Sequence, residues 1–274
     1  MGTEIGIELA KMVRRSRTYA GPIIMLLLII MALLGIKYGP MFHAIQNRLS
    51  QDFIITGTVI NALLLTRFML FEPVVYMFMP LFSCIVFGDL LASEAADGTI
   101  RTLMCRPISR TRVALSKYLT GAAYAILLAY GSAAVAYTLG LIFLGRGPLV
   151  SLTGFGLLPE HTAMIRLLET YGIVALSMIA IGSVAFAIST FVSNSLVTIA
   201  IGVGMVIFSS IIGAIDFFEK LRPYLLTTYM SLGPYFESTV DHSLVRRTIT
   251  VMLAYIVVSL AAALVIFNRR DILS

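Results

Sequence analysis

The stretch LVTIAIGVGMVIFSSIIGAI, which occupies Leu196–Ile215, contains no charged side chain. A helix of about 20 residues, at about 1.5 Å per residue, crosses roughly 30 Å, the thickness of the hydrocarbon core of a bilayer. Similar runs recur along the chain, which is 59% hydrophobic and 12% charged, whereas soluble domains have about 25% charged residues. The sequence therefore predicts an integral membrane protein with the bilayer as its solvent.

Six such runs predict an all-α protein with six transmembrane helices in a single domain, residues 1–274. The expected spans cover about 19–36, 68–90, 113–144, 171–191, 196–215 and 248–267. The second span contains Pro73 and Pro80, and we expect it to kink because each proline removes a backbone donor.

The third span carries a small residue at every fourth position, which lets another helix approach closely. The approaching helix can belong to the same subunit, or the small residues can line a dimer seam or a translocation wall. These residues are Gly121, Ala125, Ala129 and Ala133.

Residues 3–17 predict an amphipathic helix ahead of the first span. Ile5, Leu9 and Met12 fall on one face, and the charged residues fall on another. A basic amphipathic helix beside a span lies in the plane of the membrane interface; the alternative is a solvated beginning of the first span. The charged residues are Glu4, Glu8, Lys11 and Arg15.

The basic residues set the expected orientation. Their densest clusters lie within 14–17 and 101–117, and cytoplasmic flanks carry an excess of Lys and Arg. Both clusters predict cytoplasmic termini, a cytosolic loop at 91–112 and an extracytoplasmic segment at 216–247. The aromatic residues of this last segment are expected to form short helices that dip into the outer leaflet and cap the exit path, or a folded loop without that role. The net charge of +6 indicates contact with anionic lipid headgroups of the cytoplasmic leaflet rather than with a nucleic acid.

The most informative segment is Gly88–Arg110. A short amphipathic helix is expected between two positions that disfavour helix. They are Gly98 and Arg106, which precedes Pro107. The apolar side chains of this helix, together with flanking arginines, form a knob that suits docking to a moving partner. The alternative is a basic loop that only satisfies the positive-inside rule. The apolar residues of the knob are Ile100, Leu103 and Met104.

The order of residues in this segment resembles the signature of ABC-2 type permeases, and the ending at 267–272 resembles the C-terminus of that family. The resemblance implies a type V exporter-like transmembrane domain that pairs with a second permease subunit, as a homodimer, and with two cytosolic ABC ATPases. It also implies that the N-terminal helix is an elbow helix and that the 91–112 loop carries a coupling helix. The residues that inherit the coupling role are Glu94, Gly98, Thr99, Ile100, Arg101, Leu103, Arg106, Pro107 and Arg110.

The chain contains no Gly-Lys pair, which a phosphate-binding P-loop requires. ATP and Mg²⁺ are therefore expected on the partner ATPase, and this chain is expected to be no enzyme and to hold no cofactor. Its His, Met and Cys residues show no metal-ligand spacing, so no metal site is predicted.

Glu72 lies near the outer end of the second span, where an ionisable residue is a candidate for a functional role. It is expected either to pair with Arg67 or to serve a substrate path or gate. The walls of the spans are otherwise apolar. The sequence thus predicts an exporter permease for a lipid, peptide antibiotic or drug in a prokaryotic plasma membrane. The alternative is an ion-gradient-driven secondary transporter or channel.

Overall fold

The computed structural model describes residues 2–39, 60–96, 109–150, 157–192, 194–232, 235 and 242–269. Within them, six helices are long and apolar enough to cross a membrane. Apart from short irregular connections, the described residues are helical except for one short β-pairing. In it, Leu149 of β1 (Leu149–Val150) lies opposite Leu158 of β2 (Leu157–Leu158). The six spanning helices confirm the prediction of a multi-pass membrane protein. The helices are α1 (Gly2–Arg14), α2 (Ser16–Tyr38), α4 (Ala62–Phe68), α5 (Met79–Ala96), α7 (Arg110–Phe143), α8 (Glu160–Ser189), α9 (Ser195–Ala214) and α10 (His242–Arg269).

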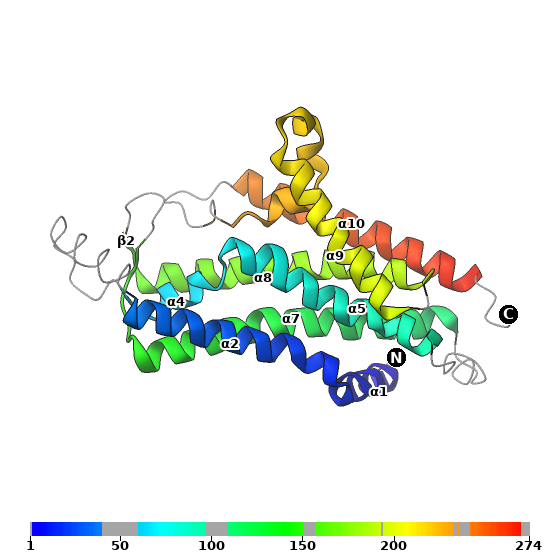
Figure 1. Cartoon of the computed structure of the whole chain (residues 1–274), viewed down its shortest axis with the longest axis horizontal. Coiled ribbons are helices and arrows are strands. Elements are labelled where there is room, and N and C mark those ends of the chain that lie inside the picture. Colours follow the sequence, from blue (N-terminus) through cyan, green and yellow to red (C-terminus); the bar gives the residue numbers. More distant parts are fainter. Residues whose placement is uncertain are drawn as a thin grey trace.

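The long helices run roughly side by side, and the start of α1 and the end of α10 lie at the same end of the molecule (Figure 1). Helix α7 matches the span expected at about 113–144 to within three residues. Helix α8 does not match the span expected at 171–191, because it starts at Glu160, about three turns earlier. Apolar residues with a helical period extend beyond the stretch that hydropathy alone marks as a span.

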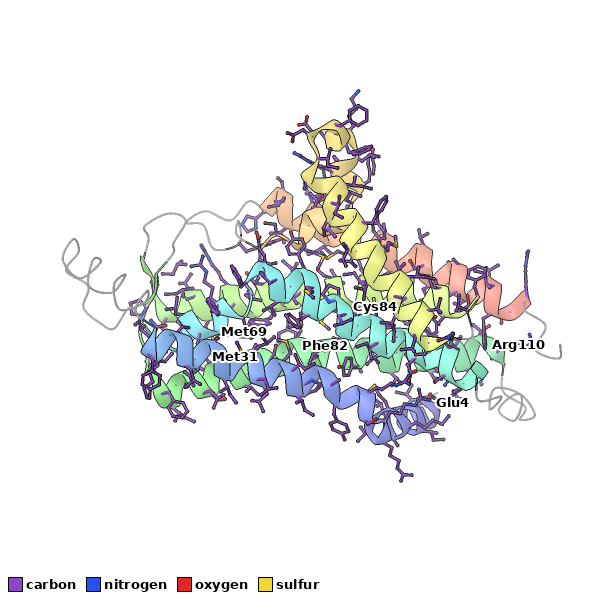
Figure 2. All side chains as sticks on the ribbon, viewed as in Figure 1. Glu4, Met31, Met69, Phe82, Cys84 and Arg110 are labelled. Carbon is purple, nitrogen blue, oxygen red and sulfur yellow. The ribbon has the colours of Figure 1, made fainter. Side chains whose placement is uncertain are left out.

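Helices α5 and α8 form the centre of the bundle. In the most apolar stretch of the second span 72% of residues are buried, against 11% in the last span, α10. Figure 2 shows Phe82 and Cys84 of α5 inside the bundle. The Ser83 hydroxyl donates to the Met178 carbonyl of α8 at 2.5 Å, and the Tyr118 and Ser183 hydroxyls lie 2.8 Å apart. Polar groups in the core therefore bond across helices, as a hydrocarbon environment demands.

The small residues of the third span, α7, are buried inside the subunit. A Cβ atom at Gly121 would lie 2.9 Å from the Phe87 ring of α5, so only glycine admits this approach. The structure thus supports the first alternative, in which the small residues of α7 pack against a helix of the same subunit.

The second span is irregular at its prolines, as predicted. Helix α4 ends at Phe68, and a five-residue π-helix, η1 (Val74–Phe78), follows Pro73 and leads into α5. Pro80 lacks an amide hydrogen and its ring collides with the carbonyl four residues earlier, so the chain widens to the i→i+5 pattern of a π-helix. The Met79 amide donates to the Val74 carbonyl in that pattern.

The segment after α9 forms two 3₁₀-helices, η2 (Asp216–Tyr224) and η3 (Leu226–Met230), which confirm the expected short helices. Figure 1 shows η2 projecting from the side of the bundle beyond α9. Phe217 is 88% exposed, which suits contact with lipid or with another protein.

Candidate functional site at the charged end of the bundle

Four charged side chains form a closed ring where α1 meets α5 and α7. We name Glu8, Lys11, Glu94 and Lys117 the charge quartet. The Lys117 Nζ atom lies 2.8 Å from an oxygen of Glu8 and 2.8 Å from an oxygen of Glu94. The Lys11 Nζ atom lies 3.0 Å and 3.2 Å from the other oxygens of the same two carboxylates. Each carboxylate therefore bridges both ammonium groups.

Three members of the quartet are withdrawn from solvent, whereas the Lys11 side chain is 39% exposed. The side chain of Lys117 is 1% exposed, and those of Glu8 and Glu94 are 9% and 6% exposed. Burial alone raises the pKa of Glu8, but the neighbouring Lys117 and Lys11 outweigh it and hold that pKa below its ordinary value. Burial likewise opposes the charge of Lys11, yet its bonds to Glu8 and Glu94 raise its pKa. The charged forms of Glu8 and Lys11 are thus stabilised by their partners in the quartet.

Helix α1 turns part of its charged side toward the bundle, because Glu8 and Met12 are its most buried residues. Our prediction that Glu8 and Met12 fall on different faces is wrong, because residues four apart share one face of a helix. Both pack against the bundle, whereas Ile7 and Val13 are more than half exposed. Arg15 has an extended backbone, which separates α1 from α2 and lets α1 bend away from it (Figure 1). The bend brings the Glu8 carboxylate to Lys117.

A second ionic contact joins the α1–α2 bend to α5 and α9. The Asp89 carboxylate accepts from Arg15 at 2.8 Å, from Arg17 at 2.9 Å and from the Ser195 hydroxyl at 2.8 Å. Arg15 also donates to the Ser93 hydroxyl at 2.9 Å. We name Asp89, Arg15, Arg17 and Ser195 the Asp89 node. The node ties the beginning of the first and fifth spans to the end of the second.

Gly88 explains why α9 comes near enough to reach Asp89. A Cβ atom at position 88 would lie 3.1 Å from Cγ2 of Thr198, so a larger residue would push α9 away from α5. A cavity of about 20 Å³ lies between the node and the quartet, which is room for about one water molecule. The Gly88-Asp89 dipeptide is therefore a packing and charge element that holds α9 on α5.

The residues expected to couple to an ATPase divide into two groups. Glu94 lies in the quartet, and Arg110 begins α7 at the same end of the molecule as Glu4 (Figure 2). The Arg110 guanidinium lies 3.5 Å from the Asn268 carbonyl, and the Asn268 amide donates to the Thr111 hydroxyl at 3.2 Å. The start of α7 and Asn268 of the C-terminal motif are therefore neighbours. The other expected residues lie outside the described residues: Gly98, Thr99, Ile100, Arg101, Leu103, Arg106 and Pro107.

Arg67 and Glu72 lie on either side of the break in the second span. Arg67 is in the last turn of α4, and Glu72 is an exposed residue just before Pro73 and η1. The pairing of the two residues and their role in a substrate path or gate stay predictions. Among the residues that the structure describes, no group of three His, Cys, Asp or Glu side chains is arranged to hold a metal ion.

Sequence reasoning placed Lys117 in the basic cluster at 101–117 but did not name it as a site residue. It lies four positions before Gly121, in step with the buried small residues of α7. A lysine in register with a packing stripe points into the bundle, and a buried lysine requires a partner carboxylate. That register is the signal that identifies Lys117.

The fold and the charged end define a multi-pass helical membrane protein with its N-terminal helix locked ionically to the spans. Residues 25–273 match the family model described as "Protein of unknown function (DUF2705)", so the chain belongs to this family. It is also similar to "Uncharacterized protein YhcI" of Bacillus subtilis (strain 168), with 29% identity over 204 residues. That match covers 70% of this chain and 64% of the relative, so the chain spans less than two thirds of that protein's length.

Proposed function

We propose that this chain is the permease subunit of an ATP-driven exporter of the ABC-2 type, which moves an amphipathic or hydrophobic substrate. The observation that carries the proposal is the ionic locking of both flanks of the 97–109 segment to α1. Glu94 stands before that segment and Lys117 after it, and both bond to Glu8 or Lys11. Force applied to the segment by a partner is transmitted to α1, α5 and α7 together.

The partners in this proposal are two cytosolic ABC ATPases, which bind ATP and Mg²⁺, and a second copy of the permease. The charged end faces the cytoplasm, because Arg14, Arg15, Arg17, Arg110 and Arg112 gather there. Both termini then lie in the cytoplasm of a prokaryotic cell, and the chain sits in its plasma membrane.

The proposal is tested by coexpressing the chain with the ABC ATPase encoded nearest to it and reconstituting the complex in vesicles. We expect ATP-dependent movement of a fluorescent amphiphile, and no ATP hydrolysis by the permease alone. Arg101→Ala, or deletion of residues 100–104, should abolish transport while the permease still inserts and hydrolysis by the ATPase persists.

Arg146→Ala is the matched control, because Arg146 is an exposed arginine beyond the C-terminal end of α7 and outside the 91–112 loop, and its loss should leave transport unchanged. Transport driven by an ion gradient without nucleotide would overturn the proposal and favour a secondary transporter. Unchanged transport in the 100–104 deletion would remove the coupling role of the loop.

A further inference from the structure

A cavity of about 620 Å³ opens between α8 and α10, away from the charge quartet. Packed protein interiors contain few voids larger than a water molecule, and sites for organic ligands measure roughly 300–1,000 Å³. The volume lies in the range of a ligand site, and the cavity is an open groove, because Glu169, His242 and Ile249 of its lining are exposed.

The wall formed by α8 changes from polar to apolar along the helix. Thr162 and Ile165 begin the lining of this wall. The charged residues Arg166 and Glu169 then precede the apolar residues Ile173 and Leu176. Their spacing of three and four residues places all four on one face of α8. From Arg166 to Leu176 this face extends about 15 Å.

The wall formed by α10 repeats the same order independently. His242 begins the helix, and Val245 and Ile249 follow on one face. Helices α8 and α10 run in the same direction (Figure 1), and Ser177 contacts Met252 just beyond the cavity. The polar residues of both walls therefore lie at one end of the cavity and the apolar residues at the other. The N-terminus of α10 adds positive potential at the polar end.

We propose that this cavity binds a zwitterionic aminophospholipid. Arg166, His242 and the α10 N-terminus face the phosphate, because guanidinium groups and helix N-termini both recognise phosphate oxygens. Glu169 faces the ammonium group of the headgroup. An acyl chain lies along Ile173, Leu176 and Val245. The site is independent of the exporter proposal, since it requires only that the spans lie in a bilayer.

The test uses the absence of tryptophan from the chain. Ile249→Trp places a single fluorescent reporter on the cavity wall, and Val257→Trp places one on an exposed position of the same helix, outside the cavity lining. Both proteins are reconstituted in bilayers in which one lipid carries brominated chains, which quench tryptophan on contact. The headgroups compared are ethanolamine, glycerol and choline.

We expect brominated phosphatidylethanolamine to bind beside the reporter at position 249 about tenfold more tightly than the glycerol lipid, as one charge-assisted contact provides. The reporter at position 257 should show no preference. The bulkier choline group should bind more weakly than ethanolamine because it cannot donate to Glu169. Glu169→Gln should remove the preference for ethanolamine over glycerol, and Arg166→Gln should weaken binding of every phospholipid at this position.

A Leu176→Trp reporter on the apolar part of the α8 wall guards against the ring at position 249 filling the cavity, and both reporters should agree. Equal quenching by all three headgroups, a preference for the glycerol lipid, or a preference that survives Glu169→Gln would overturn the proposal. Monodisperse protein with an unchanged melting temperature confirms that each variant is folded. The experiment contains no ATPase, so its outcome is separate from that of the transport test.

Discussion

Two ion pairs of equal length differ in how much they contribute to the stability of the fold, because one is buried and the other is exposed. Lys117 lies 2.8 Å from Glu8 at the charged end, and Arg222 lies 2.8 Å from Asp216 in η2. The Lys117 side chain is 1% exposed, whereas that of Asp216 is 97% exposed. Water screens the η2 pair, so it contributes little, but the Glu8–Lys117 pair is held where an unpaired charge is very costly. Of the two pairs, the one at the charged end is therefore expected to contribute more to the stability of the fold.

The largest effect is expected from Lys117→Met, which keeps the length of the side chain and removes its charge. Glu8 and Glu94 then face each other with only Lys11 between them, and breaking such a buried group costs about 3–5 kcal/mol. We expect a clear fall in the melting temperature in detergent, measured by thermal unfolding, and faster hydrogen exchange in α1.

A quadruple variant separates lost pairing from lost packing. Glu8→Gln, Lys11→Met, Glu94→Gln and Lys117→Met together remove all four charges while the volume is nearly kept. This variant should be more stable than Lys117→Met alone, because no buried charge remains without a partner. If the quadruple variant is the less stable of the two, the electrostatic account of the quartet is wrong.

An intermediate effect is expected from Asp89→Asn. The variant keeps the shape of the side chain but leaves Arg15 and Arg17 without their anion. Their side chains are 32% and 55% exposed, so water replaces part of the interaction and the cost is about 1–2 kcal/mol. Ser195→Ala, which removes one hydrogen bond to the same carboxylate, should cost less. Equal losses for the two variants would show that the arginines contribute nothing through Asp89.

The sequence predicts the spans well because hydropathy is a local signal. The run at 19–36 falls within α2, and the run at 196–215 coincides with α9 to within one residue, since each contains enough apolar residues to mark its own position. The prolines at 73 and 80 likewise act locally, by removing amide hydrogens, so their irregularity was predictable. The early start of α8 at Glu160 was not, because its first turns carry charged residues that hydropathy excludes.

The candidate site was harder to predict because it depends on distant contacts. Glu8 and Lys117 are separated by 109 positions, and no local pattern states which lysine meets which carboxylate. Asp89 lies in the informative segment Gly88–Arg110, but its bond to Ser195 follows from the close approach of α9 at Gly88. The sequence shows that Lys117 lies four positions before Gly121 and therefore on the buried face of the helix. It does not show which carboxylates Lys117 meets.

A smaller effect is expected from pH, acting on the docking of α1. The folded pKa of Glu8 lies below its ordinary value of 4.5, so its contribution is complete above that value and is lost as pH falls through the lowered pKa. The folded pKa of Lys11 lies above 10.5, so its contribution is complete below 10.5 and is lost as pH rises through the raised pKa. Hydrogen exchange in α1, corrected for its intrinsic pH dependence, should therefore be slowest between these limits.

Glu8→Gln is the control for the acid limb of this profile. It removes the titrating group, so the acid-dependent release of α1 attributable to Glu8 should disappear while the alkaline limb remains. An acid limb of the same size in this variant would assign the titration to another carboxylate.

The smallest effect is expected from Asp216→Asn, which completes the comparison at the exposed pair. Asp216 is almost fully solvated, and Arg222 keeps its bond to the Gly213 carbonyl at 2.8 Å, so no measurable change in melting temperature is expected. Arg222→Gln should cost slightly more, because it also leaves that carbonyl without its donor. A loss from Asp216→Asn as large as that from Lys117→Met would mean that η2 is covered by lipid or by another subunit, where its charges are no longer screened by water.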